Sequence, residues 1–185
     1  MEIRNIFLGK KTSIGLIAKE DANTLSHWSC NGHFARYYDT AYAMPATKEA
    51  FEKLIENSEN SNTETWFAIR TIPQNKLIGT VSLHSIEWNN GNAILSIGIG
   101  EKDYQNGGYG TDALQLILAY GFTELNLHRI SLEVIAYNDI AINTYKKVGF
   151  KIEGTIRERV NRDNKRHNVI QMGILKKEWN LLNYS

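Results

Sequence analysis

The sequence has little cysteine, no long apolar run and almost no net charge, and each shortage excludes a class of protein. A single cysteine, Cys30, rules out an intrachain disulfide and fits a reducing compartment. No apolar stretch approaches the roughly 20 residues that span a bilayer. The segment Met1–Asn5 also lacks the start of a secretory signal. We therefore expect a cytoplasmic protein without a membrane partner.

The charged residues are nearly balanced, which argues against a nucleic-acid partner. A formal net charge of +1 provides no broad positive surface for a phosphate backbone. One basic cluster lies near the C-terminal end, but Glu158 and Asp163 interrupt it, and short charge runs of this kind usually form a solvated hairpin. The members of the cluster are Arg157, Arg159, Arg162, Lys165 and Arg166.

What is present is the composition of an ordinary globular protein. Hydrophobic residues make up 42% of the chain and charged residues 22%, without internal repeats or a low-complexity linker. A chain of 185 residues is long enough to bury a substantial core. We therefore expect a single domain over residues 1–185, and the sequence leaves open whether it is a monomer or a homodimer.

Alternating strand and helix patterns predict a mixed α/β fold, with a central sheet of about seven strands flanked by about four helices. The aromatic segment His33–Pro45 is expected to be irregular, and Asp163–Asn164 is expected to join the last two strands as a hairpin. The expected strands are Thr12–Ala18, Trp66–Thr71, Leu77–Ile86, Ala93–Gly100, Arg129–Ala136, one beginning at Phe150, and Val169–Leu175. The expected helices are Asp21–Ser29, Thr47–Asn60, Thr111–Leu125 and one between Asn138 and Gly149.

The segment Gln105–Gly110, which reads Gln-Asn-Gly-Gly-Tyr-Gly, predicts a phosphate-binding loop. An apolar strand precedes it and an amphipathic helix follows it. The first N–H groups of a helix lack partners, and glycines let an anion approach the backbone. A Walker-type loop is excluded because no lysine accompanies Gly110 and Thr111, and the dinucleotide fingerprint fails at Asp103. The alternative is a helix entry whose glycines merely pack.

A second motif runs from Asn138 to Phe150. Asn138 is a suitable N-cap, and Ala141, Ile142 and Tyr145 follow on the same helical face. A tyrosine at such a position is most often a packed core residue with its hydroxyl satisfied nearby.

Together the two motifs resemble the coenzyme A signatures of the GNAT superfamily of N-acetyltransferases. Gln105-x-x-Gly108-x-Gly110 is similar to the pyrophosphate signature of that family. The stretch from Asn138 to Gly149-Phe150 is similar to its second motif, and a strand separates the two as expected. The resemblance implies acetyl-CoA as cosubstrate, an α/β fold of the GNAT type and no metal.

The resemblance also implies roles for individual residues. Tyr145 would be the general acid for the leaving thiolate, and Asn138 would hold the pantetheine arm or order a water molecule beside it. The backbone of the last strand residues before the loop would contact pantetheine and the thioester, and the loop itself would bind the diphosphate. These cofactor-binding residues are Gly98, Ile99, Gly100, Gln105, Asn106, Gly107, Gly108, Tyr109 and Gly110.

The general base is not identified by any motif. His84, Glu87, Glu101 and Glu133 are candidates, as is a water molecule, and each of these side chains is on its own more often structural or solvated than catalytic. The aromatic segment 33–42 and Trp88 are candidate walls of the acceptor pocket, although aromatic residues more often pack in the core.

The acceptor is expected to be a primary amine. The flanks Gly149–Arg157 and Met172–Trp179 resemble the Rim-type branch, which acetylates the N-termini of ribosomal proteins. Asn164 and Asn168 depart from the Gly and Asp that this branch often has there, which weakens the transfer of acceptor specificity. A small-molecule amine, such as a polyamine, aminosugar or amino acid, is the alternative. Two other classes remain open, a non-catalytic acetyl-CoA-binding regulatory module and a nucleotide- or phosphosugar-binding domain.

Overall fold

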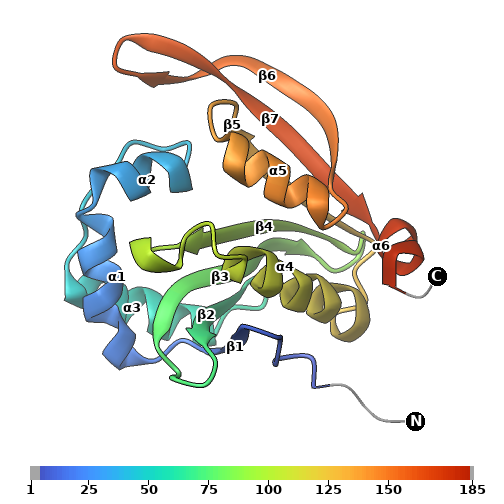
Figure 1. Ribbon diagram of the computed structural model, residues 1–185, viewed down its shortest axis with the longest axis horizontal. Helices are drawn as coiled ribbons and strands as arrows, with labels where there is room; N and C mark the ends of the chain where they lie inside the picture. Colours follow the sequence, from blue (N-terminus) through green and yellow to red (C-terminus); the bar gives the residue numbers. More distant parts are fainter. Residues whose placement is uncertain (1–4, 184–185) are drawn as a thin grey trace.

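The computed structural model describes residues 5–183, which form a seven-stranded mixed sheet with helices on both faces (Figure 1). Residues 1–4 lie outside this range. They include most of the segment Met1–Asn5, which we expected to lack a secretory signal. The strands are β1 (Thr12–Leu16), β2 (Thr65–Thr71), β3 (Leu77–Glu87), β4 (Asn92–Ile99), β5 (Arg129–Ile135), β6 (Lys151–Arg162) and β7 (Lys165–Leu175). The helices are α1 (Ala22–Ser29), α2 (Gly32–Tyr38), α3 (Lys48–Glu59), α4 (Tyr109–Ala119), α5 (Asp139–Lys147) and α6 (Lys176–Asn183).

The strand order is β1-β2-β3-β4-β5-β7-β6, and β4 and β5 are parallel to each other. All other neighbouring strands are antiparallel. The parallel pairing of β4 with β5 joins only Asn92–Ile94 to Arg129–Ser131, although both strands continue beyond it. The sheet is therefore split beyond Ile94, where β4 and β5 are no longer paired with each other.

The hydrophobic core lies in two layers, one on each face of the sheet. On one face, α4 and α5 pack on inward-facing residues of the central strands, such as Leu83, Leu95 and Leu132. On the other face, α1 and α3 cover the β1–β3 part of the sheet with Trp28 and Ile55. The helices thus leave the second face of β4, β5 and β7 available for a cavity.

Two helices within residues 5–183 were not expected, so the flanking α-helices number six rather than about four. The segment expected to be irregular forms α2, because Asn31 caps its first turn by accepting the N–H groups of His33 and Phe34. The other is α6, which follows β7 directly. The helix expected to reach Leu125 ends as α4 at Ala119 and continues as a π-helical turn over Tyr120–Glu124.

The remaining elements follow the expectation, and the hairpin is confirmed. Asp163 and Asn164 join β6 to β7 with φ values of 51° and 60°, a left-handed turn that Asp and Asn tolerate well. Strand β7 begins at Lys165, four residues earlier than expected, and the hairpin of β6 and β7 projects past the body of the sheet (Figure 1). In the described part of the chain, none of the helices has the length and apolar character needed to cross a membrane.

Candidate active site

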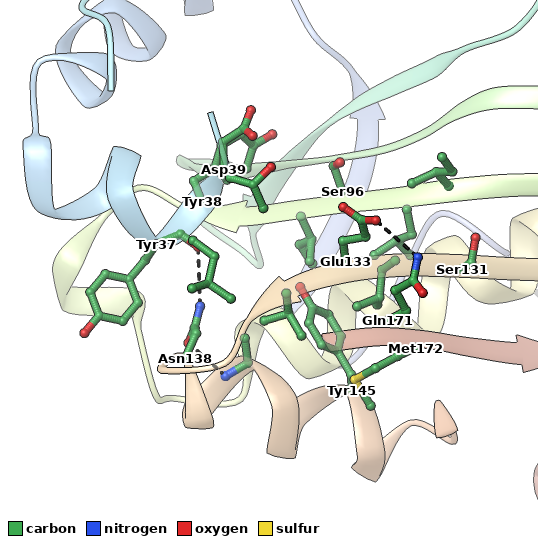
Figure 2. Close-up of a pocket in the computed structure, with 18 of the residues that line it drawn as sticks. Tyr37, Tyr38, Asp39, Ser96, Ser131, Glu133, Asn138, Tyr145, Gln171 and Met172 are labelled. Carbon is green, nitrogen blue, oxygen red and sulfur yellow. Dashed lines mark hydrogen bonds between the residues drawn. The ribbon is translucent and has the colours of Figure 1, made fainter. Parts of the chain in front are cut away.

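A cavity of about 590 Å³ opens where β4 and β5 part (Figure 2). Strands β3, β4, β5 and β7 contribute its floor, α2 and α5 its sides, and the β6–β7 hairpin part of its wall. Its polar lining includes His84, Ser96, Ser131, Glu133 and Gln171.

The polar lining follows from the strand register. Directly paired residues of neighbouring strands project on the same face, so Ile94 shares a face with Ser131, and Glu133 with Gln171. The residues between them, such as Leu132, project to the opposite face and enter the core under α4 and α5. The alternation thus gives the cavity its polar side chains from one face of the sheet. At the gap the cavity is also lined by apolar residues of the core face, which are Leu95, Ile97, Leu132, Val134 and Met172.

Tyr145 reaches this cavity from the other side of the sheet. It belongs to α5, is only 9% exposed, and packs edge-on against Phe150 with ring centroids 5.8 Å apart. Figure 2 shows its hydroxyl directed into the cavity at the opening between the strands. Burial, together with the nearby Tyr38, raises the pKa of the Tyr145 phenol above its ordinary value. The phenol is therefore protonated at neutral pH and can donate a proton or a hydrogen bond.

Asn138 forms the N-cap of α5, as expected. Its Oδ1 accepts the N–H of Ala141 at 3.2 Å, and its Nδ2 donates to the carbonyl of Tyr37 at 3.4 Å (Figure 2). The amide thus orders the first turn of α5 and joins it to α2. Its contact with a pantetheine arm stays a prediction.

The predicted diphosphate loop stands at the N-terminus of α4. Gly108 is the N-cap residue with φ 84°, a left-handed conformation that explains the glycine, and no side chain caps the helix. Among the described residues, a Cβ atom at Gly108 would have only the Nζ atom of Lys11 within 4 Å, so the space in front of the first turn is open there. Unpartnered first-turn N–H groups beside open space fit a diphosphate.

Gln105 and its neighbours shape that loop. The Nε2 atom of Gln105 donates to the carbonyl of Ile99 at 2.9 Å, which ties the loop to the end of β4. Asn106 has φ 60°, and Tyr109 packs edge-on against Tyr104. Contacts of Gln105, Asn106, Gly107, Tyr109 and Gly110 with a diphosphate stay predictions.

Lys11 is a loop residue that sequence reasoning missed. Its Nζ donates to the carbonyl of Gly107 at 2.7 Å and lies 5.4 Å from the centre of the Tyr109 ring. Asp112 in the first turn of α4 accepts the backbone N–H groups of Lys10 and Lys11 and so fixes this segment beside the loop. No local pattern in the sequence indicates a contact between residues so far apart.

Gly98 and Gly100 serve packing between the sheet and the helices above it. A Cβ atom at Gly98 would lie 2.5 Å from the ring of Tyr38, and one at Gly100 would lie 2.1 Å from the ring of Trp28. These glycines therefore let α1 and α2 approach the end of β4. The pantetheine contacts expected of Gly98, Ile99 and Gly100 stay predictions, and the carbonyl of Ile99 already accepts the Gln105 amide.

Two of the four side chains considered as general base line the cavity, and two do not. Glu101 pairs with Lys76 at 2.7 Å, which lowers the pKa of its carboxyl group, and Glu87 accepts the Asn90 amide in the β3–β4 turn. Glu133 lines the cavity but pairs with Arg159 at 2.5 Å. His84 lines it with both ring nitrogens near hydroxyl groups.

The aromatic segment 33–42 and the β6–β7 hairpin meet across the cavity mouth. Arg36 of α2 pairs with Asp163 at 2.6 Å, and the Nη2 atom of Arg162 donates to the carbonyl of Ala41 at 2.6 Å. The Tyr137 hydroxyl donates to the carbonyl of Arg36 at 2.7 Å. Tyr37 and Tyr38 line the cavity, whereas Trp88 donates to the carbonyl of Asn62 and is absent from the lining.

A comparison with protein families finds one match, to the acetyltransferase (GNAT) domain, over residues 14–151. The spermidine N(1)-acetyltransferase of Escherichia coli strain K12 is 27% identical over 88% of this chain and 85% of its own. The putative ribosomal N-acetyltransferase YdaF of Bacillus subtilis is 28% identical over 56% of each chain.

Among solved structures, the chain is similar to spermidine N-acetyltransferase from Vibrio cholerae in complex with CoA and spermine. The TM-score is 0.83 at 26% identity, over 91% of this chain and 97% of the other. The relatives thus include spermidine acetyltransferases and one protein named a putative ribosomal acetyltransferase, and assignment to the Rim-type branch is not confirmed.

Proposed function

The chain belongs to the GNAT family of acetyltransferases and is an acetyl-CoA-dependent N-acetyltransferase, and we propose that it acetylates a primary amine bound in the cavity between β4 and β5. The observation that carries this proposal is the position of Tyr145. Its hydroxyl reaches the cavity through the gap between the strands, whereas the open N-terminus of α4 lies on the side of the sheet from which Tyr145 comes.

In this proposal the two substrates meet at the gap in a ternary complex. The loop 105–110 holds the diphosphate of acetyl-CoA, whose thioester supplies the acetyl group. The neutral amine attacks the thioester carbon from the cavity side, the carbon–sulfur bond breaks, and Tyr145 donates a proton to the departing sulfur. The proton that the acylated nitrogen then loses restores the phenol, so a neutral amide and a free thiol are formed. No covalent acetyl-enzyme is needed, and Cys30 does not line the cavity.

We infer that the acceptor carries a single amine, as a peptide N-terminus does, because two of the three carboxylates that line the cavity are already neutralised by arginines. Glu133 pairs with Arg159, and Glu153 pairs with Arg129. The second pair lies flat on β7, since a Cβ atom at Gly173 would be 2.6 Å from the Glu153 carboxylate. A polycation would have to displace the arginines or leave its own charges unpaired, and both are costly.

A polyamine acceptor is the second candidate. It is favoured by the likeness to spermidine acetyltransferases and by Asp39, a cavity carboxylate for which no ion pair is found in the described residues. The carboxylate of Asp39 accepts only the N–H of Ala41 at 2.9 Å among the hydrogen bonds found there.

The proposal is tested by measuring kcat/KM for a panel of acceptors with acetyl-CoA. The panel contains peptides with free N-termini, the same peptides with blocked N-termini, spermidine, an aminosugar and free amino acids. We expect the free peptides to exceed both their blocked forms and spermidine. A preference for spermidine would support the second candidate. Acetyl-CoA binding without transfer to any amine would indicate a regulatory module instead.

A further inference from the structure

His84 lies between the cavity and the protein surface, with a hydroxyl group on each side of its ring. Its Nε2 atom is 3.0 Å from the Oγ atom of Ser96, a residue of β4 that lines the cavity (Figure 2). Its Nδ1 atom is 3.3 Å from the Oγ atom of Ser85, which is exposed. Imidazole can accept a proton at one nitrogen and release one at the other, so this arrangement connects the cavity to solvent.

The backbone at this point departs from regular strand geometry. Ser85 has φ 51°, and the register of β3 with β4 shifts between His84 and Glu87. Serine seldom adopts a positive φ, and bulges beside active sites commonly redirect a side chain. The bulge here leaves His84 on the cavity face and brings the Ser85 hydroxyl next to Nδ1.

On the basis of the function proposed above, we propose that His84 is the proton acceptor for the amine. The acceptor arrives as an ammonium ion and must lose one proton before its lone pair can attack. That proton passes to the Ser96 oxygen while the Ser96 O–H proton passes to Nε2. The imidazolium then releases its Nδ1 proton to water beside Ser85, so the amine becomes neutral and no proton remains on the enzyme.

The other charged groups of the cavity are less suited to this task. Glu133 would have to give up its ion pair with Arg159 to accept a proton, and the ion pair of Glu153 with Arg129 lowers the pKa of the Glu153 carboxyl group. Asp39 accepts the N–H of Ala41. The charged groups that line the cavity together with His84 are Asp39, Arg129, Glu133, Glu153 and Arg159.

The proposal predicts that the effect of His84→Gln depends on the basicity of the acceptor. An alkylamine acceptor is almost entirely protonated at pH 7, whereas a weakly basic amine of similar size, such as an arylamine, is already neutral. We expect His84→Gln to lower single-turnover transfer to the alkylamine by about 100-fold or more and transfer to the arylamine by less than about threefold. Glu87→Gln, at the same end of β3 but outside the cavity, is the control.

Calorimetric affinity for acetyl-CoA shows whether each variant keeps its fold. Should His84→Gln not fold, Ser96→Ala is measured in its place, and it should show the same dependence on the acceptor. Equal losses with both amines would overturn the proposal, because they would mean that His84 only supports packing. An amine-dependent loss in Glu133→Gln but not in His84→Gln would overturn it as well. Wild-type protein that acetylates neither amine would instead contradict the proposed function.

Discussion

The carboxylate of Asp112 accepts both the backbone N–H and the hydroxyl of Thr12 at 2.8 Å, although 100 residues separate the two in the sequence. The N–H groups of Lys10 and Lys11 donate to the same carboxylate. The first turn of α4 therefore holds the start of β1 beside the diphosphate loop. Through this contact the Lys11 ammonium reaches the carbonyl of Gly107.

Asp112→Asn should destabilise the protein at neutral pH. Burial alone would raise the pKa of Asp112, but the hydrogen bonds from Lys11, Lys10 and Thr12 outweigh it and hold the pKa below its usual range. A carboxyl group with a lowered folded-state pKa stabilises the fold above its unfolded pKa of about 4, and this stabilisation is lost as pH falls through the folded value. The variant should lose about 1–3 kcal/mol at pH 7 in urea unfolding, and less at pH 3.

Asp103→Asn is the control for this experiment, because Asp103 is exposed near the same loop. A pH-independent difference between Asp112→Asn and the wild type would show that the carboxylate charge is not what stabilises the contact.

Gly108→Val should weaken acetyl-CoA binding. The φ of 84° disfavours valine, and its side chain would fill the open space in front of the α4 N-terminus. We expect the dissociation constant to rise by about tenfold or more in calorimetry. Gly91→Val is the comparison, since Gly91 also has a positive φ of 65° but lies in the β3–β4 turn, where a Cβ atom would lie 3.1 Å from the backbone N of His128. If both variants bind acetyl-CoA equally, the loss at Gly108 reflects backbone strain alone.

Lys11→Met should also weaken acetyl-CoA binding, but by less than Gly108→Val does. The lysine is exposed and its charge is screened by salt, so we expect the dissociation constant to rise by about two- to fivefold at low ionic strength. The difference from wild type should shrink in 0.5 M salt, because the electrostatic screening length is then only roughly 4 Å. Lys10→Met is the comparison, and an equal effect of the two substitutions would argue against a specific contact by Lys11.

Tyr145→Phe should slow single-turnover acetyl transfer by about 100- to 10,000-fold, with little change in acetyl-CoA affinity. The substitution keeps the packing against Phe150 and removes only the hydroxyl that points into the cavity. Because the pKa of Tyr145 is raised, its ionisation should not reduce wild-type activity up to about pH 10. A Phe variant within about twofold of wild type would mean that the tyrosine is a packing residue.

Arg162→Met should raise the KM of the acceptor and leave that of acetyl-CoA unchanged. The guanidinium holds the segment after α2 against the hairpin by donating to the carbonyls of Asp39, Thr40 and Ala41. Loss of these bonds should loosen the wall of the acceptor cavity, and we expect at least about a threefold increase. Arg166→Met, an exposed position on the same hairpin, serves for comparison. Parallel increases in both KM values would contradict a role confined to the acceptor side.

Much of the fold was predictable from the sequence because its signals are local. The strand before Gln105, the glycines after it and the amphipathic helix that follows lie within a short stretch, and the same holds for Asn138 and the helix that it caps. The α2 helix was missed because its one local signal, the Asn31 cap, precedes a helix of only seven residues that also depends on long-range packing. The rings of Phe34 and Tyr38 fit over Gly98, which no pattern within the segment could indicate.

The sequence by itself determined the order of the strands and of four of the six helices along the described chain, the family resemblance and the two motifs, since each depends on residues close together in the chain. Only the tertiary structure decided which side chains share the cavity. It excluded Glu87 and Glu101 from the lining and brought His84 next to Ser96. It also paired Glu133 with Arg159 and Lys11 with Gly107. Such contacts form when distant segments pack together, and a contact across about 100 residues leaves no periodic or local pattern from which it can be predicted.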